Sequence, residues 1–282
     1  MTTVDPSPMR LPALFAAALV AAVLGGCDAL APVRPPPGAA LPTLDSAAFR
    51  RAETLIAFFE HGELVKRFEA VYRHDDGRGY TVGWLGFTTS SGSAAEVVRR
   101  YAARAPTVAV GAPLRAFGPA LDRLARTHDG DISALAAFPD AWRTASADTA
   151  FQRAQDDVAR AWYFRPAQQQ AAFLAGTGPP VSPLALATLY DIVVQHGDGP
   201  EPDGFSAVLN RAGPRGADER AWLARLNAAR RATLLAPANA ATRDAWRPTV
   251  WRSDTWQQLA ARDARLNAPV RITGAWFDLT IP

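Results

Sequence analysis

One segment of the chain, residues 183–196 (PLALATLYDIVVQH), is apolar on nearly every face. A helix of that composition is stable only when it is surrounded by protein, so the segment predicts a buried central helix. Asp191 lies within it, and Arg230 lies on the apolar stripe of a second predicted helix, residues 217–236. Because a lone buried charge is costly, each needs a partner. We predict that the two side chains pair, either as a structural salt bridge or as part of a functional site.

The rest of the sequence predicts a mainly α-helical (α+β) domain with a small β element. The 282 residues are 49% hydrophobic, which is ample for a core. Residues 80–89 predict a short strand or hairpin, 106–119 a connection, 200–216 a Pro/Gly-rich surface stretch, and the last residues an extended tail. Ser93 and Glu96 form a capping-box pattern at a helix start. The other predicted helices are 46–60, 63–72, 94–104, 119–127, 146–163, 165–175 and 253–263.

The beginning of the chain resembles a bacterial lipoprotein signal. A polar lead is followed by the apolar run Leu11–Val23 and by Leu24-Gly25-Gly26-Cys27. We predict a signal peptide over 1–26, a Pro/Ala-rich tether over 27–44 and one domain over 45–282. Cys27 would carry a lipid that holds the protein at the cell envelope, on the periplasmic face or the outer surface. An ordinary signal peptide or a short anchor helix is the alternative.

Charge and metal-ligand spacing exclude other functions. The net charge is +3 and the sequence pI is about 9.4, but the basic residues are scattered, so we predict no nucleic-acid partner. The four histidines (His61, His74, His128 and His196) have no Cys or paired-His spacing, and Cys27 is the single cysteine. We therefore expect no metal and no cofactor.

Two carboxylic acids stand beside predicted turns. Glu60 ends the predicted helix 46–60, and Asp76 opens the turn Asp76-Gly-Arg-Gly-Tyr-Thr81. Two carboxyls that face each other across a cleft can hydrolyse a glycosidic bond, one as a protonated acid and the other as an ionised base. Spacing alone leaves open that both are merely solvated.

Several motifs in a fixed order resemble the family 46 glycoside hydrolases, the chitosanases. The resemblance covers residues 47 to 280, nearly the whole predicted domain. Its motifs are Glu60, Asp76-Gly-Arg-Gly-Tyr-Thr81, Gly86-Phe87, Asp148-Thr-Ala-Phe-Gln-Arg-Ala-Gln-Asp156, Trp162-Tyr163-Phe164, Tyr190-Asp191-Ile-Val-Val-Gln-His196-Gly197, Ala229-Arg230-Arg231, Thr242-Arg243 and Leu266-Asn267-Ala-Pro269.

The resemblance implies a fold and a catalytic pair. The fold would be lysozyme-like, with two mainly helical lobes, a small sheet and a cleft between the lobes. Glu60 would be the general acid and Asp76 the general base that activates water, which implies inversion at the anomeric carbon. Thr81 would help to hold that water, unless it simply suits a strand.

The resemblance also implies a supporting network and a substrate-binding surface. Arg243 would approach Glu60 and would be tied to Arg230 and Asp191 in a buried charge relay that sets the pKa of Glu60. The alternatives for three of the residues in the cleft are lobe packing (Tyr72), bracing of the turn (Arg78) and helix capping (His196). The residues that would line the cleft are Tyr72, Arg78, Gly86, Ser93 and His196.

Two positions depart from the family pattern. Chitosan is a polycation that these enzymes bind through acidic side chains, yet Ser93 and Pro237 stand where two such acids are expected. We predict a monomeric, inverting endo-hydrolase of β-1,4-glucosamine linkages in chitosan or a related aminoglycan. One alternative is a lysozyme-like hydrolase of another periplasmic or cell-wall glycan. The other is a glycan-binding lipoprotein without activity.

Overall fold

The structure is a computed structural model that describes residues 40–74, 77–104, 108–262 and 265–282. The predicted signal peptide, Cys27 and Asp76 lie outside these residues. In the described part of the chain, no helix has the length and apolar character needed to cross a membrane.

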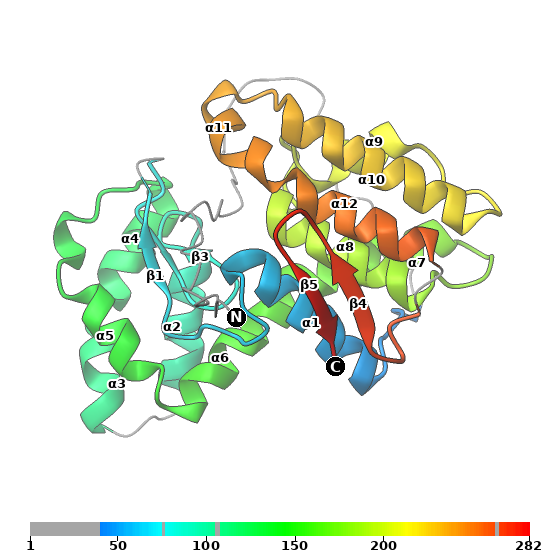
Figure 1. Cartoon of the computed structure of the whole chain (residues 1–282). Helices are drawn as coiled ribbons and strands as arrows, with labels where there is room; N and C mark the ends of the chain where they lie inside the picture. The colour runs from blue at the N-terminus through cyan, green and yellow to red at the C-terminus, as the bar shows by residue number, and fades with distance from the viewer. Residues whose placement is uncertain (1–39, 75–76, 105–107, 263–264) are drawn as a thin grey trace, which may run out of the picture.

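Two lobes are visible in Figure 1. One lobe contains the strands β1 (Val71–Arg73), β2 (Tyr80–Val82) and β3 (Phe87–Thr88), with the helices α2 (Ser93–Ala103), α3 (Val108–Arg115), α4 (Gly118–Thr127) and α5 (Phe138–Ala145). The other contains α8 (Pro183–His196), α9 (Phe205–Ala212), α10 (Glu219–Leu235), α11 (Arg243–Trp246), α12 (Val250–Ala261) and the hairpin β4 (Val270–Thr273)–β5 (Asp278–Ile281). The mainly α fold with a small sheet is therefore confirmed.

A continuous helical segment connects the lobes. It consists of α6 (Thr149–Ala159), a π-helical turn η2 (Arg160–Phe164) and α7 (Arg165–Ala175). Pro166 follows the π turn and has no backbone N–H, which explains why the regular i to i−4 pattern is interrupted there. α6 packs on α2 in the first lobe, and α7 packs on α8 in the second.

The predicted central helix is confirmed as α8. Thirteen of its fourteen residues are buried, as the apolar pattern requires. Ser182 caps its N-terminus by accepting a hydrogen bond from the backbone N–H of Ala185. α1 (Ser46–His61) and α12 both contact α8, and α10 packs on α12, so four helices surround one buried polar region.

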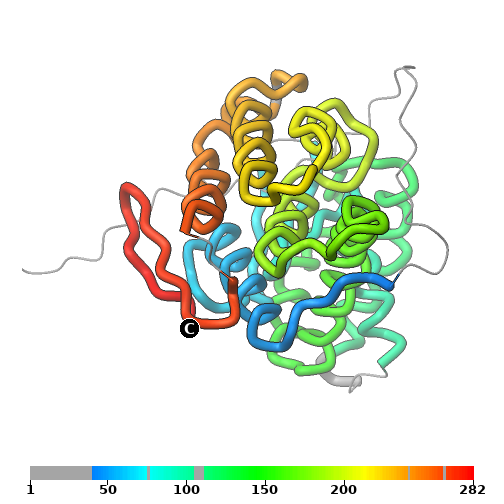
Figure 2. The backbone as a smooth tube through the Cα atoms, turned by 90° about the vertical axis from the view of Figure 1, so that its right-hand side faces the viewer, coloured from blue at the N-terminus to red at the C-terminus, as the bar shows by residue number. Residues whose placement is uncertain are grey.

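Several local predictions are wrong for physical reasons. Residues 63–72 form turns and β1 instead of a helix. α3 lies within the predicted 106–119 connection, although it contains Pro113. α9 lies in the Pro/Gly-rich stretch, where its buried face (Phe205, Val208, Leu209) holds it in the core. The predicted extended tail is confirmed as extended backbone, and its two strands pair as a hairpin that Figure 2 shows at the edge of the molecule beside α12.

The capping-box prediction is also wrong. The residue that precedes α2 is Gly92, with a φ of 85°, and Ser93 is already helical. Ser93 Oγ instead accepts a hydrogen bond from the backbone N–H of Thr88, at 2.9 Å. The side chain therefore links the helix to β3 instead of capping its own helix.

Candidate active site

Glu60 lies in the last turn of α1, where the two lobes meet. Asp45 begins this helix by accepting hydrogen bonds from the backbone N–H groups of Ala47 and Ala48. Gly62 ends it, with a φ of 73° that is favourable for glycine. Glu60 is 7% exposed, so its carboxyl group is almost entirely enclosed by protein.

Arg252 of α12 holds the Glu60 carboxyl. Its Nη1 atom donates to Glu60 Oε1 at 2.5 Å. The other side of the same guanidinium faces Asp191 of α8, with Nε 2.9 Å from Oδ1 and Nη2 2.5 Å from Oδ1. A planar guanidinium suits such paired contacts with a carboxylate. Arg252 therefore connects Glu60 directly to the buried acid of the central helix.

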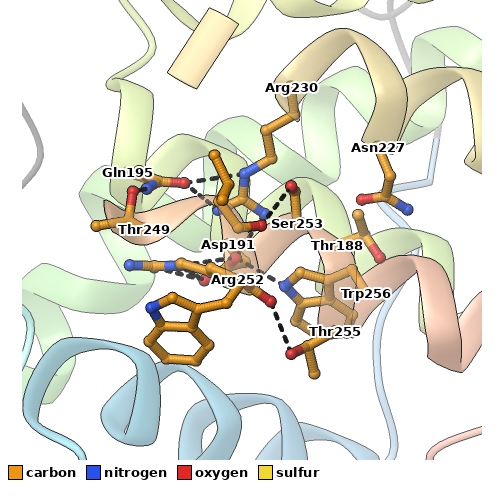
Figure 3. A network of polar contacts seen from close by, with 12 residues as sticks. Thr188, Asp191, Gln195, Asn227, Arg230, Thr249, Arg252, Ser253, Thr255 and Trp256 are labelled. Carbon is orange, nitrogen blue, oxygen red and sulfur yellow. Dashed lines mark hydrogen bonds and ion pairs between the residues drawn. The ribbon is translucent and has the colours of Figure 1, made fainter. Parts of the chain in front are cut away.

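Asp191 has two further partners. Arg230 Nη1 of α10 lies 2.7 Å from Asp191 Oδ2, and both side chains are completely buried. Trp256, one turn after Arg252 on α12, donates its indole N–H to the same oxygen at 2.7 Å. Figure 3 shows these side chains converging on Asp191 from α10 and α12. The predicted pairing of Asp191 with Arg230 is confirmed.

A further layer of polar contacts fixes Arg230. Gln195, one turn after Asp191 on α8, accepts hydrogen bonds from Arg230 Nε at 3.0 Å and from Nη2 at 2.5 Å. Gln195 in turn donates to Thr249 Oγ1 at 2.9 Å (Figure 3). Each charged side chain of the network thus has a polar or charged partner at hydrogen-bond or ion-pair distance, as buried charges require.

The two buried carboxyls have opposite pKa shifts. Burial raises the pKa of Glu60 and outweighs the attraction of Arg252, which bonds the carboxyl, and that of Arg230. Burial also acts on Asp191, but Arg252 and Arg230 together outweigh it, so its pKa falls below the ordinary value. Burial lowers the pKa of Arg230 to about 10 despite the attraction of Asp191. A proton that enters the network is therefore held by Glu60, while Asp191 remains ionised.

The prediction for Arg243 is wrong. Arg243 is the first residue of the short helix α11, and its side chain is exposed. Arg252 takes the predicted place beside Glu60. A sequence signal for it exists, because Arg252, Trp256 and Leu259 have the i, i+4, i+7 spacing of a buried helix face. The same reasoning that identified Arg230 applies to Arg252, but we predicted that this helix begins only at residue 253.

The glycine-rich turn leads into β2, which pairs with β1 and β3. Gly77 and Gly79 both have a φ of 75°, a conformation that favours glycine. Arg78 between them is buried, and its backbone carbonyl accepts a hydrogen bond from Thr89 Oγ1 at 3.2 Å. The part of the turn after Asp76 is therefore held against the loop after β3 by the bond between Arg78 and Thr89.

Thr81 and Gly86 lie beside Glu60. Gly86 has a φ of 71°, and a Cβ atom there would be 3.4 Å from Glu60 Oε2 and 3.5 Å from Thr81 Cγ2. Thr81 is buried on β2, and its Oγ1 has no hydrogen-bond partner among the described residues. An unpaired buried hydroxyl can hold a water or a ligand oxygen. The structure thus places two predicted site residues against the predicted acid.

The other predicted binding residues have different environments. Tyr72 of β1 is half-buried, and its hydroxyl lies 3.4 Å from Nδ1 of His61, the residue after Glu60. His196 is only 1% exposed, with its ring against Trp246 and Nδ1 2.8 Å from the carbonyl of Asp203. The prediction that His196 lines the cleft is therefore wrong, because other residues of the protein cover its ring.

The described residues contain no group of three or more His, Cys, Asp or Glu side chains that could hold a metal ion. What the site offers instead is one enclosed carboxyl with a raised pKa, an arginine that stabilises its ionised form, and a buried hydroxyl nearby. That set can donate a proton to a leaving group and then hold the resulting carboxylate.

Comparison with known proteins supports this interpretation. The family model described as glycosyl hydrolase family 46 matches residues 54–270. A chitosanase of Bacillus subtilis is 39% identical over 231 residues, covering 79% of this chain and 80% of its own. A chitosanase of Streptomyces is 31% identical over 232 residues, covering 78% and 77% of the two chains.

Solved structures agree with the sequence match. The native chitosanase of Bacillus subtilis MY002 has a TM-score of 0.78 at 36% identity, with 85% of this chain and all of the other covered. A Gynuella sunshinyii chitosanase in complex with chitotetraose has a TM-score of 0.77 at 33% identity, covering 85% and 99%. The fold is therefore lysozyme-like, and the chain belongs to glycosyl hydrolase family 46.

Proposed function

We propose that this protein cleaves β-1,4-glucosamine linkages inside chitosan chains, with inversion at the anomeric carbon. The observation that carries the proposal is the enclosed Glu60 carboxyl, which has a raised pKa and is bound to Arg252. The named relatives support the substrate class, since one solved relative is a mutant chitosanase of Bacillus subtilis MY002 complexed with 6 GlcN.

Glu60 is the general acid in this proposal. Burial keeps its carboxyl protonated to higher pH than an exposed glutamate, so it can give a proton to the glycosidic oxygen. Once the proton has left, Arg252 stabilises the carboxylate at 2.5 Å. Asp191 fixes the opposite side of that guanidinium and so sets its orientation. The buried relay is therefore a positioning device for the acid.

Asp76 is the general base in this proposal. It removes a proton from a water that attacks the anomeric carbon from the face opposite the leaving oxygen, which inverts the configuration. Asp76 lies outside the described residues, so its role rests on the motif and on its neighbours. Thr81, with its unpaired buried hydroxyl, is placed to hold the water.

We further propose that a lipid on Cys27 holds the enzyme at the cell envelope as a monomer. The apolar run followed by Leu24-Gly25-Gly26-Cys27 supports this location. Incorporation of radioactive palmitate into the full chain, and its loss in Cys27→Ala, would test the anchor. Labelling that persists in Cys27→Ala would contradict it.

A second candidate substrate is a different envelope glycan, such as peptidoglycan or a neutral β-glucan. It is favoured by Ser93 and Pro237, which occupy positions where the family pattern has acids. Ser93 is buried and bonded to the backbone of Thr88, and Pro237 is buried, so neither can attract an ammonium group as an acid would.

Product release by the full chain distinguishes these functions. Chitosan of several acetylation levels would be compared with peptidoglycan and neutral β-glucans, with Glu60→Gln and Asp76→Asn as inactive variants. Glu63→Gln is the matched control, because Glu63 is nearby but pairs with Arg67 at the surface. We expect chitosan cleavage in which the α-anomer appears first by NMR. Turnover of another glycan without chitosan cleavage would select the second candidate, and glycan binding without any turnover would make the protein a binding lipoprotein.

A further inference from the structure

The turn of the C-terminal hairpin presents an exposed tryptophan. Trp276 lies between β4 and β5 and is 45% exposed, whereas Trp84, Trp142, Trp222, Trp246 and Trp256 are fully buried. It also lies after residue 270, where the match to the family model ends. A large aromatic ring left open to solvent needs an explanation that the catalytic network does not supply.

Trp276 is held in place by other rings. Its ring centroid lies 4.7 Å from that of Phe277, 5.0 Å from Trp251 and 5.8 Å from Phe58. The turn itself is closed by a hydrogen bond from the backbone N–H of Gly274 to the carbonyl of Phe277, at 2.9 Å. The neighbouring rings therefore hold the Trp276 side chain in one orientation, so it loses little conformational freedom when a ligand binds its exposed face.

The aromatic cluster is continuous with the surroundings of the proposed acid. Trp251 on α12 contacts Phe59 at a centroid distance of 5.4 Å, and the Arg252 guanidinium lies 5.2 Å from the same Phe59 ring. Phe59 is the residue before Glu60. β5 packs on α1, and Figure 2 shows the hairpin at the edge of the molecule. The exposed ring thus lies on a path of packed side chains that leads to the site.

We infer that Trp276 is a glycan-binding platform, a subsite that stacks on a sugar ring of the polymer away from the bond that is cut. The inference rests on the proposed function and extends it. The apolar face of a pyranose can cover an indole, and a glucosamine adds an ammonium group that is attracted to the π face. Acids at positions 93 and 237 would attract a cationic polymer, and this chain has Ser93 and Pro237 there. A contact with Trp276 would replace part of that attraction.

The exposed apolar area favours a sugar over a second copy of the chain. A stable dimer interface needs about 800 Å² from each partner with an apolar centre. Among the described residues, the exposed large hydrophobic side chains are Val65, Trp162, Phe173 and Trp276, and they belong to separate elements of the fold. A single exposed indole ring has the area to cover one sugar ring, but it is too small to form the apolar centre of a dimer interface.

Trp276→Ala in the full chain tests the platform. We expect KM for long chitosan to rise about threefold to tenfold, from the loss of one aromatic contact, while kcat and KM for a short oligomer stay unchanged. Trp276→Phe should restore most of the affinity. Phe173→Ala is the matched control, because Phe173 is 44% exposed on α7 and has no place in the site. The melting temperature of each variant shows whether it is folded.

Each outcome decides something. If the parent protein cleaves chitosan but Trp276→Ala behaves like Phe173→Ala, the platform is overturned and the proposed function stands. If the parent protein sediments as a dimer and Trp276→Ala as a monomer, the ring serves a second copy and the platform is overturned. If the parent protein does not cleave chitosan, the proposed function fails and takes the platform with it.

Discussion

Helix α1 carries two buried glutamates, two turns apart, in two different ionic clusters. Glu53 pairs with Lys66 at 2.9 Å, and Lys66 also bonds Asp156 at 2.7 Å and lies over the ring of Trp84. Glu60 pairs with Arg252, which is held in turn by Asp191. Burial raises the pKa of both glutamates. A raised pKa therefore does not by itself identify the catalytic acid.

The neighbours of the two glutamates distinguish them. Glu60 faces Gly86 and lies close to Thr81, whose hydroxyl is unpaired among the described residues. The partner of Glu53 is a lysine that bridges α1 to α6, which belongs to the helical segment between the lobes. We conclude that the Glu53 cluster has a structural role, whereas the Glu60 cluster positions a reactive group. The predictions below test this difference, from the largest expected effect to the smallest.

The two glutamates should differ most in their effect on catalysis. Glu60→Gln removes the proposed proton donor and should lower kcat by about 10²–10⁴-fold. Glu53→Gln should keep kcat near that of the parent protein, because Glu53 does not contact the site. Initial rates of chitosan cleavage measure both. A comparable loss of kcat in both variants would contradict the assignment of a structural role to Glu53 and a catalytic role to Glu60.

Removal of the second acid of each cluster should have different effects on the stability of the protein. Asp191→Ala leaves Arg230 and Arg252 without their shared carboxylate and should cost about 3–5 kcal/mol of unfolding free energy. Asp156→Ala breaks a partly exposed pair and should cost about 1 kcal/mol or less. Urea unfolding gives both values. An Asp191→Ala protein as stable as the parent would contradict the claim that Asp191 compensates the two buried arginines.

Arg252 and Arg243 form a second matched pair. Arg252→Lys keeps the charge but loses the fork that contacts Glu60 and Asp191 together, so kcat should fall and the pH profile should change. Arg243→Lys should have no effect, since that side chain is exposed. If Arg243→Lys impaired catalysis and Arg252→Lys did not, the assignment of the relay arginine would be reversed.

Trp256→Phe should have a smaller effect. It removes one hydrogen bond to Asp191 while nearly preserving the ring, and it should cost about 1–3 kcal/mol of stability. The lost donor also makes Asp191 a weaker anchor for Arg252, so the basic limb of the pH–rate profile should move. Thermal unfolding combined with that profile separates the two consequences, and an unchanged profile would assign Trp256 to packing alone.

Acid should destabilise the protein through His196. Burial, reinforced by Arg230, lowers the pKa of this histidine to about 3, against about 6.5 when it is exposed. The unfolded chain therefore binds a proton that the folded chain does not bind, and stability falls as the pH drops from about 6.5 towards 3. Unfolding free energies for the parent and for His196→Gln measure this. An equal slope in both would show that His196 does not contribute.

The sequence predicted most where hydrophobic patterning decides the structure. α8 and α10 follow from apolar positions, and the pairing of Asp191 with Arg230 follows from the cost of burying either one alone. The motif around Glu60, Thr81 and Gly86 predicted residues that the structure brings together. These are cases in which local preference and tertiary packing agree.

The predictions failed where packing overrides local preference. α3 tolerates Pro113, and α9 forms within a Pro/Gly-rich stretch because its apolar face is buried. Arg252 was missed because its helix begins earlier than its pattern indicated. The burial of His196 and the support of Trp276 depend on contacts between elements far apart in the chain, which no local pattern records.

Titration of the Glu60 carboxyl tests the central claim most directly. In the full chain labelled with ¹³C at glutamate and aspartate carboxyls, Glu60→Gln and Asp191→Asn identify the two resonances. We predict that Glu60 titrates above the ordinary glutamate value, because burial outweighs Arg252, and that Asp191 titrates below the ordinary aspartate value. A Glu60 carboxyl that titrates at or below its ordinary value would be ionised at working pH, and it could not be the proton donor.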